Sequence, residues 1–474
     1  MGFGYLLYIV LVSALGGLLF GFDSGVISGC DKAIQAQYAL SDWNHGFTIS
    51  VALIGTIIGA FGIGRPCDWI GRRKSLFLMA FLFFVSAFGC AFAPDWYTLV
   101  IMRFIGGLAI GGASVVVPLY IVEIAPGHLR GRLVATNQLN IVFGILVSYI
   151  SNYFVAMAID NKWVVWDCCT TIANWFVTVP MGAEEIKWRL MLGAECLPII
   201  LFWALLFTIP ESPRWLVRKG RRCEAKQILS RIGDSNPERT VQDIETSLAV
   251  IHNNQGQDNV RLFQSKYLWV IFLAWSVAMF NQLSGINAIN YYAPRIFEMF
   301  QFGKSAALFA TMGVGTVNLA FTFLAFFFID WFGRRALLML GALGTTAMHL
   351  MVAWQLSLPP DQMNSTIAIG GIFGFIAFFA ISQGAVIWVF ISEIFPNAVR
   401  AKGQALGSFT HWVMCTGISW LFPVVAASAG WMAFAFFGCM TMLQFFFALF
   451  LMPETKGGTI EQMEQRLTKD NQAA

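Results

Sequence analysis

Twelve long apolar runs constrain this chain more than any other feature. A membrane-spanning helix needs about 20 apolar residues, because the hydrocarbon core of a bilayer offers no water to hydrogen-bond an exposed backbone. The chain is 57% hydrophobic and 12% charged, too apolar for a soluble core to bury. The sequence predicts an all-α membrane protein whose twelve transmembrane helices cover about 6–28, 47–65, 75–93, 98–121, 135–158, 188–209, 267–292, 305–329, 336–356, 367–391, 404–428 and 431–452.

A polar stretch over 211–262 separates the first six runs from the last six. It contains RKGRRCEAKQILSRIGD and ERTVQDIETSLAVI, in which apolar residues recur at helical spacing between charges. We therefore expect short amphipathic helices at the membrane surface between two bundles. The predicted domains are an N-terminal six-helix bundle (1–210), a cytoplasmic helical linker (211–262), a C-terminal six-helix bundle (263–453) and a short cytoplasmic tail (454–474).

An internal repeat supports the division into two halves. Three motifs recur in the same order: DWIGRR at 68–73 with DWFGRR at 330–335, EIAP at 123–126 with EIFP at 393–396, and PES at 210–212 with PET at 453–455. Each pair follows the second, fourth or sixth helix of its half. This pattern indicates parallel duplication of a six-helix unit, as in two-lobed transporters.

Basic residues follow the even-numbered helices and are scarce in the opposite connections. By the positive-inside rule, both termini are predicted to be cytoplasmic. That rule explains any single arginine but not the regularly placed acids among them. We therefore predict a salt-bridge lock between the bundles, formed by Arg65, Asp68, Arg72, Arg73, Glu123, Arg130, Asp330, Arg334, Arg335, Glu393 and Arg400.

Asp23 lies in GFDSGVISG, within the first apolar run, and Arg103 lies within the fourth. Ionised groups at membrane depth are costly and usually mark an ion or substrate pathway. A pair is tolerated where a lone charge is not. One interpretation is a fixed structural ion pair. The other is a switch, in which the Asp23–Arg103 separation changes with conformation and Asp23 loads and releases a proton in each cycle.

Amides and aromatic residues recur within the later runs. Amides donate and accept hydrogen bonds together, which suits hydroxyl groups, and tryptophan faces suit the C–H face of a sugar ring. No cluster of buried charges could hold a charged substrate, so the set favours a neutral polyol. The alternative is that the amides join helices to each other. The predicted substrate-binding residues are Gln138, Asn281, Gln282, Asn287, Asn318, Trp388, His411 and Trp412.

Catalytic signatures are absent from the sequence. It has no GxxxxGK[ST] phosphate loop, and its histidines and cysteines lack metal-ligand spacing. We expect no enzyme activity, no cofactor beyond a coupling ion and no nucleic-acid partner, but a sugar substrate, a lipid bilayer and a functional monomer. The connection 159–187, with Cys168 and Cys169, is interpreted as a lid over the outer mouth or as a passive loop.

These motifs resemble the sugar porter family of the major facilitator superfamily, which includes bacterial sugar–proton symporters and animal facilitative glucose transporters. The signatures read GRPCDWIGRRKS, VEIAPGHLRGR, PESPRWL, QLSGIN, DWFGRR, SEIFPNAVR and PETKG, and the resemblance covers nearly the whole chain. It implies the major facilitator fold and alternating access around one midplane site. It also implies sugar contacts at Gln138, Gln282, Asn287, Asn318 and Trp388, an extracellular gate at Tyr291 and Tyr292, and a proton site at Asp23 with Arg103.

Three positions depart from or refine the family pattern. Asn281 stands where many members have Gln, and His411 replaces a usual Asn or Gln, which could make binding pH-dependent. Ile145 matches glucose transporters rather than xylose symporters and favours a hexose. The prediction is therefore a proton-coupled importer of a hexose such as glucose, in a bacterial inner membrane or a eukaryotic plasma membrane. The alternatives are a sugar uniporter, a sodium-coupled symporter and a transporter-like sugar sensor.

Overall fold

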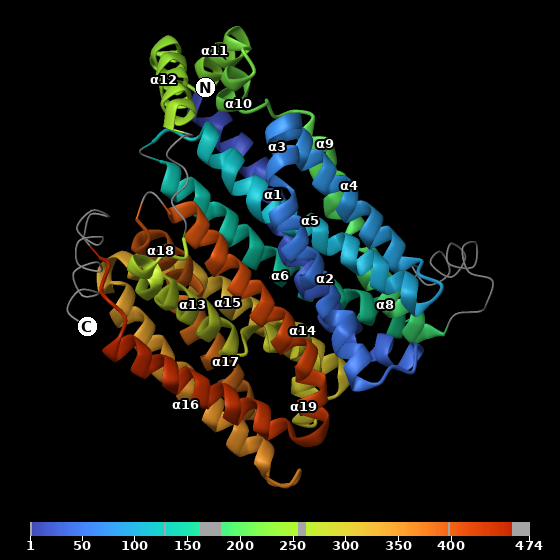
Figure 1. Ribbon diagram of the computed structural model, residues 1–474. Helices are drawn as coiled ribbons and strands as arrows, with labels where there is room; N and C mark the ends of the chain where they lie inside the picture. The colour runs from blue at the N-terminus through green and yellow to red at the C-terminus, as the bar shows by residue number, and fades with distance from the viewer. Residues whose placement is uncertain (1, 128, 162–181, 255–261, 397–398, 457–474) are drawn as a thin grey trace. The chain divides into compact units, whose positions relative to one another are not determined.

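The computed structural model describes residues 2–127, 129–161, 182–254, 262–396 and 399–456, and within these ranges every regular element is a helix (Figure 1). Helices satisfy their own backbone hydrogen bonds, which suits a chain whose solvent is lipid. Most of the connection 159–187, including Cys168 and Cys169, lies outside the described residues. So do the end of the predicted tail and the side chain of Asp330.

The first half contains six predicted spans, and the last of them is interrupted. Its helices are α1 (Gly2–Gln37), α2 (Asp42–Gly62), α3 (Gly64–Ile70), α4 (Arg72–Ala91), α5 (Trp96–Ile124), α6 (Arg130–Asp160), α8 (Ala183–Gly193) and α9 (Cys196–Leu206). The short α3 lies between two spans and carries the start of the DWIGRR motif, whose two arginines begin α4. Helices α8 and α9 form the sixth span, and the break between them places Glu195 in the middle of an apolar segment.

The second half contains the other six spans, with two further interruptions. Its elements are η1 (Ser265–Tyr267), α13 (Leu268–Leu283), α14 (Ile286–Met299), α15 (Lys304–Phe332), α16 (Arg334–Ser357), α17 (Ser365–Ile381), α18 (Gln383–Ile394) and α19 (Arg400–Phe450). The seventh span breaks between α13 and α14, and the tenth breaks between α17 and α18.

Helix α19 contains the last two predicted spans. A straight helix of its 51 residues would be about 76 Å long, more than twice the hydrocarbon thickness. The backbone leaves the helical region at Ala429 (φ −161°, ψ 93°), between the two predicted apolar runs. Counting α19 as two spans, the described helices provide the twelve predicted crossings, and the chain is a multi-pass integral membrane protein.

The chain forms two compact units whose boundaries do not follow the helix ends. Unit 1 comprises 1–26, 51–151 and 161–259, and unit 2 comprises 27–50, 152–160 and 260–474. The last part of α1, the start of α2 and the end of α6 therefore pack with the C-terminal half. The sequence-based division at residue 210 remains a prediction about how the chain is duplicated.

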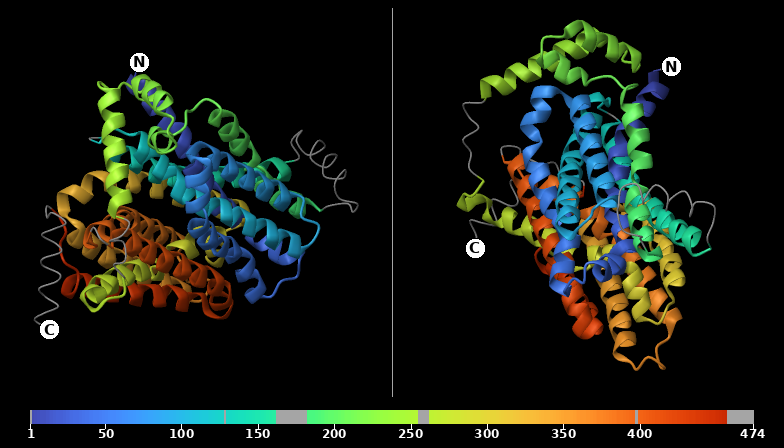
Figure 2. Two further views of the ribbon diagram at one scale, coloured as in Figure 1. Left: turned by 45° about the horizontal axis from the view of Figure 1, so that its top comes forward. Right: turned by 90° about the vertical axis from the view of Figure 1, so that its right-hand side faces the viewer.

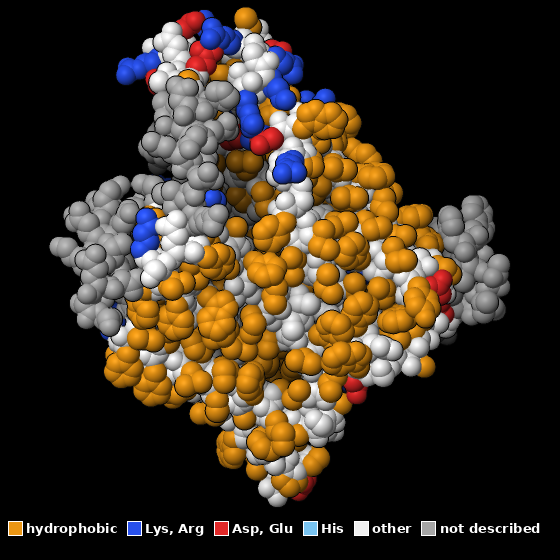
Figure 3. All heavy atoms as spheres, viewed as in Figure 1, with side chains coloured by type: hydrophobic (Ala, Val, Ile, Leu, Met, Phe, Trp, Pro, Cys, Tyr) orange, Lys and Arg blue, Asp and Glu red, His pale blue; other side chains and the backbone are white. Residues whose placement is uncertain are grey.

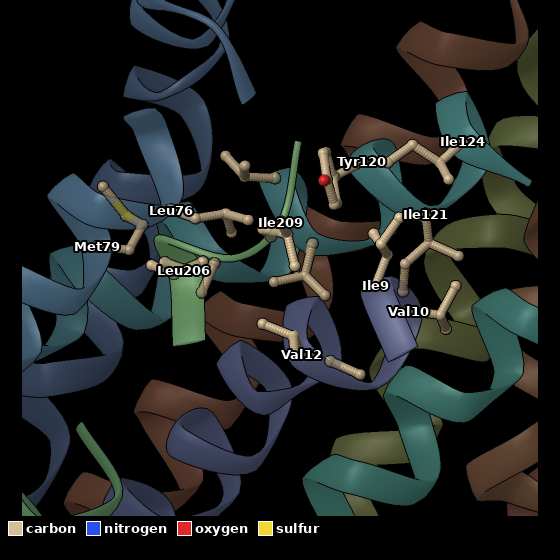
Figure 4. Close-up of a cluster of buried hydrophobic side chains, with 14 of the residues drawn as sticks. Ile9, Val10, Val12, Leu76, Met79, Tyr120, Ile121, Ile124, Leu206 and Ile209 are labelled. Atoms are coloured by element: carbon tan, nitrogen blue, oxygen red, sulfur yellow. The ribbon is translucent and has the colours of Figure 1, made fainter. Parts of the chain in front are cut away.

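The core of unit 1 joins α1, α4, α5 and α9 to the segment that follows α9. Figure 4 shows part of it, with Val10 and Ile121 from α1 and α5 near each other and Met79 beside Leu76 on α4. In unit 2 the corresponding core is built from α13, α16, α18 and α19. Many large apolar side chains remain exposed on the spans, among them Phe61, Phe327 and Trp331, as expected for surfaces that face lipid.

The polar stretch forms α10 (Pro213–Arg218), α11 (Arg222–Arg231) and α12 (Pro237–Asn254), which confirms the predicted short helices. Their buried residues, such as Leu216, Leu229 and Val241, join the core of unit 1. Figure 2 shows these helices together at the end of unit 1 where the chain begins. In Figure 3 charged side chains gather over them, whereas hydrophobic side chains dominate the visible surface of the spans.

Candidate functional site

Helices α1 and α5 bring Asp23 and Arg103 together inside unit 1. Arg103 Nη1 donates to Asp23 Oδ1 across 2.7 Å, and each side chain is only 3% exposed. The pair links residues 80 positions apart, so only the packing of the two helices could create it. In the membrane interior each charge requires the other, because removing one partner leaves an uncompensated buried ion. The pairing proposed from the sequence is therefore present.

Glycines on α5 bring neighbouring helices close to this pair. A Cβ at Gly107 would lie 2.0 Å from the carbonyl oxygen of Ala52, and one at Gly111 would lie 2.1 Å from that of Thr56. Such contacts let the backbones of α2 and α5 touch, as small residues do in membrane bundles. The IGGLAIGG segment after Arg103 thus fixes the depth at which the guanidinium sits.

Glu195 is a third buried ionisable group at this site, and the sequence analysis did not select it. It lies at the break between α8 and α9, is 2% exposed, and interacts with both Asp23 and Arg103. Two carboxylates thus lie in the electrostatic field of one guanidinium, and Asp23 is the one that pairs with it. The signal was available in the sequence, because Glu195 stands within the apolar run MLGAECLPIILF and the argument applied to Asp23 applies equally to it.

The break between α13 and α14 organises the amides of unit 2. Gly285 has φ +80°, and a Cβ there would lie 2.5 Å from the ring of Phe437, so glycine is required both for conformation and for space. Gln282 precedes the break and Asn287 follows it. Asn287 Nδ2 donates to Gln282 Oε1 across 2.7 Å, and Gln282 Nε2 donates to Asn281 Oδ1 across 3.1 Å. The broken helix therefore brings three predicted amides into one chain of hydrogen bonds.

Helix α19 adds His411 and Trp412 to this amide cluster, and α18 adds Trp388. The Gln282 amide nitrogen lies 3.2 Å from the imidazole nitrogens of His411. The His411 ring centroid lies 4.9 Å from that of Trp388 and 5.0 Å from that of Trp412. Six of the eight predicted substrate-binding residues thus lie together in unit 2, with donors, acceptors and aromatic faces adjacent.

The remaining predicted residues lie in less direct positions. Gln138 is half-buried on α6 in unit 1. Asn318 is buried on α15, where its Oδ1 accepts a 3.3 Å hydrogen bond from Thr322. Tyr291 and Tyr292 are buried at a kink in α14, and Tyr292 Oη donates to the carbonyl of Ser419 across 2.8 Å. Their roles as sugar contacts and gate remain predictions.

In unit 1 the three duplicated motifs meet in one polar site. Arg72 donates to Asp68 Oδ1 (3.0 Å) and to Glu123 Oε1 (2.8 Å), and Ser212 Oγ donates to Glu123. Glu211 accepts hydrogen bonds from the backbone N–H groups of Arg72, Arg73 and Ser212. Burial raises the pKa of the Glu211 carboxyl from its ordinary value, although these donors act in the opposite direction.

Unit 2 repeats this arrangement at equivalent positions. Arg334 donates to Glu393 Oε1 across 2.8 Å, and Thr455 Oγ1 donates to the same carboxylate. Glu454 accepts from the backbone N–H groups of Arg334 and Arg335. The third motif of each repeat, PES or PET, therefore completes the site of the other two.

Several residues assigned to the cytoplasmic lock have different partners or none within the described set. Arg73 and Arg335 donate to the final carbonyls of α9 and α19, a common role for cations at helix C-termini. Arg400 Nε donates to the Phe395 carbonyl, and Arg65 and Arg130 are exposed. The ion pairs seen lie within a unit, and pairing between bundles remains a prediction.

Comparison with known proteins identifies the family. The family model described as "Sugar (and other) transporter" matches residues 9–467. The chain belongs to the sugar porter family. Sugar porters are transporters rather than enzymes. This sugar porter is 36% identical to the D-xylose-proton symporter of Escherichia coli (strain K12), over 97% of this chain and 95% of that one. It is 34% identical to the arabinose-proton symporter of Bacillus subtilis (strain 168), over 98% and 95%.

A glucose transport protein of Synechocystis is also similar, at 32% identity over 97% of each chain. Among solved structures, the inward-open xylose transporter XylE from E. coli matches with a TM-score of 0.82 and 35% identity, covering 98% of this chain and all of that one. Another XylE structure, of the major facilitator proton:xylose symporter bound to 6-bromo-6-deoxy-D-glucose, matches with a TM-score of 0.75. This sugar porter therefore has the predicted major facilitator fold.

Proposed function

We propose that this sugar porter imports a monosaccharide together with a proton by alternating access, acting as a single chain with both termini in the cytoplasm. The observation that carries the proposal is the buried set of Asp23, Glu195 and Arg103. Two carboxylates and one guanidinium are neutral only when one carboxylate holds a proton. A neutral state is favoured at membrane depth, so protonation accompanies the cycle.

The same set disfavours the two alternative coupling modes. A uniporter has no need for a second buried acid beside an ion pair that is already balanced. A sodium ion prefers several oxygen ligands, but Arg103 already occupies Asp23 and repels a cation. Among the described residues no group of three His, Cys, Asp or Glu side chains is arranged to hold a metal ion. The symport of relatives such as the xylose and arabinose carriers agrees with proton coupling.

The substrate we propose is a neutral sugar ring held by the amides around Gly285 and by Trp388. The prediction of a hexose rested on Ile145, which is buried on α6 with its backbone packed against Gly21 and Gly25 of α1. Helix packing accounts for that residue without a sugar. The xylose and arabinose carriers named above make a pentose the first candidate, and the glucose transport protein keeps glucose as the second.

In the proposed cycle, a proton from outside weakens the hold of Asp23 on Arg103, and the sugar binds to the unit 2 cluster. The outer side closes near Tyr291 and Tyr292, and the cytoplasmic side opens. Sugar and proton leave, and Asp23 pairs again with Arg103. Binding of sugar and proton thus shifts the conformational equilibrium toward the state that is open to the cytoplasm, which the empty, deprotonated carrier does not favour.

The test uses purified protein in liposomes with an inward proton gradient and radiolabelled D-xylose, L-arabinose and D-glucose in separate runs. We expect the native chain to accumulate one of them uphill, and Asp23→Asn to lose accumulation while retaining counterflow exchange. Asp361→Asn, an exposed carboxylate, is the matched control. Equilibration without accumulation by the native protein would establish the uniporter instead, and movement of glucose alone would restore the hexose assignment.

A further inference from the structure

A second buried charged cluster lies in unit 2, where the last part of α1 and the first part of α2 meet α14. Asp31 on α1 is 2% exposed, the His45 side chain on α2 is fully buried, and Arg295 on α14 is 12% exposed. Arg295 Nε lies 2.7 Å from Asp31 Oδ2, and His45 Nε2 hydrogen-bonds Asp31 Oδ1. The proposed symport mechanism does not use these residues.

The hydrogen bonds define the charge state of this cluster. Asp31 can only accept, so the proton of the Asp31–His45 bond lies on Nε2 of the imidazole. The other ring nitrogen, Nδ1, is buried and has no hydrogen-bond partner among the described residues. A proton there would bury an unsatisfied cationic N–H. The structure thus fits a neutral His45, with the charges of Asp31 and Arg295 cancelling.

The surrounding polar groups are paired among themselves. On α1, Lys32 pairs with Glu298 of α14, and Gln35 bonds to both Arg295 and Asp42 of α2. On α14, the Tyr292 ring lies 6.3 Å from the His45 ring and 5.9 Å from the Arg295 guanidinium carbon. Asp31 is the acid that contacts His45.

The cluster sits where helices leave one unit and join the other. Helix α1 belongs to unit 1 up to Val26 and to unit 2 from Ile27, and α2 returns to unit 1 at Val51. A hydrogen bond reinforces the attachment within unit 2, because Trp420 Nε1 donates to the Trp43 carbonyl across 3.1 Å. Arg295 follows Tyr292, the kink of α14, by one helical turn. The cluster therefore joins the predicted gate segment to α1 and α2.

We propose that Asp31, His45 and Arg295 are positioning residues for the transport step, holding the outer ends of α1 and α2 on α14 in the closed state. This inference rests on the proposed function, because alternating access requires those ends to separate when the site opens to the outside. Separation admits water, which hydrates both charges and offsets the loss of their pairing.

The experiment measures the distance from the end of α1 to the start of α15, the helix that follows α14, without sugar or a proton gradient. Cys168, Cys169 and the exposed Cys223 and Cys439 are replaced by Ser, and fluorophores are attached at Gln37→Cys and Ser305→Cys, both exposed. Single-molecule energy transfer then reports the closed and open populations of each variant at neutral pH. Asp23→Asn keeps the cluster intact and separates its effect from that of the proton site.

We expect Asp31→Asn to shift the population toward the open state by at least about tenfold, because Arg295 loses its buried partner. His45→Gln retains a donor to Asp31, so it stays closed like the native protein. Lys32→Gln, which breaks the neighbouring exposed pair, behaves as native. Native-like populations in Asp31→Asn, or an open population in His45→Gln, would overturn the proposal.

Two outcomes keep this result separate from the transport hypothesis. If Asp31→Asn does not fold, Arg295→Gln removes the other charge of the same pair and is expected to give the same shift. If no sugar is transported, the populations of the empty protein still report on the cluster. A closed population that depends on the Asp31–Arg295 pair, in a chain that moves no sugar, would sustain the cluster and refute the proposed function alone.

Discussion

Charge balance decides the chemistry of single residues in this membrane protein. Asp23 is balanced by Arg103, whereas Glu195 is an additional acid in the same enclosed space. A proton is the smallest species that restores neutrality there. The Asp31 cluster differs, because one acid meets one guanidinium and a neutral imidazole completes it without a proton.

Glu195→Gln is predicted to uncouple sugar movement from protons. The glutamine preserves size but removes the excess negative charge, so Asp23 and Arg103 balance each other without protonation. Accumulation in proteoliposomes should disappear, and counterflow exchange should become nearly independent of pH. The control is Glu184→Gln, an exposed acid at the start of α8. Unchanged accumulation in Glu195→Gln would exclude the residue from coupling.

Breaks in helices determine where the functional elements lie. The sixth, seventh and tenth spans are each interrupted, and Glu195, Gly285 and Ser382 mark the interruptions. An interrupted helix frees backbone polar groups, which membranes tolerate only where protein or a cavity satisfies them. The predicted amides flank the second break, so the irregular backbone and the substrate cluster occupy the same place.

At the level of the element, Gly285→Ala is predicted to destabilise the second half. The alanine Cβ would require both a left-handed backbone and displacement of the Phe437 ring, at a combined cost of about 2–4 kcal/mol. The apparent melting temperature in detergent should fall by several degrees, and sugar binding should weaken. Gly370→Ala, in open space on α17, should leave both unchanged or raise the melting temperature slightly. Equal behaviour of the two variants would contradict the argument.

Duplication sets the organisation of the whole molecule. The two units repeat one polar site, in which the first arginine of DW-x-GRR bonds the glutamate of EI-x-P, and PES or PET supplies a hydroxyl and a second glutamate. The copies differ in burial. Glu123 is 4% exposed, and its counterpart Glu393 is 28% exposed.

Burial predicts unequal effects of matched substitutions at these two sites. Glu123→Gln weakens the partner of a buried Arg72, where breaking a pair costs about 3–5 kcal/mol, and Glu393→Gln should cost less because water reaches that site. Thermal unfolding in detergent measures the order. Arg222→Gln, from an exposed pair on α11, is the control. A larger loss from Glu393→Gln would show that exposure does not govern these sites.

The sequence by itself determined the features that depend on composition, spacing and repetition. Apolar run lengths specified twelve spans because bilayer thickness sets the length of a helix, and the repeated motifs specified two halves. Asp23 and Arg103 were recognisable because isolated charges are rare in apolar runs. The family motifs likewise indicated the amides of the seventh span and the fold.

Tertiary structure decided which of these residues meet. Glu195 joins Asp23 only because α8 and α9 break beside α1 and α5, and Asp31, His45 and Arg295 meet although Asp31 and Arg295 are far apart in sequence. Arg73 and Arg335 bind helix-end carbonyls rather than acids because of the way the spans end. Hydropathy and spacing indicate how unfavourable each residue is in lipid. They do not indicate its partner, because that depends on which helix faces pack together in the folded chain.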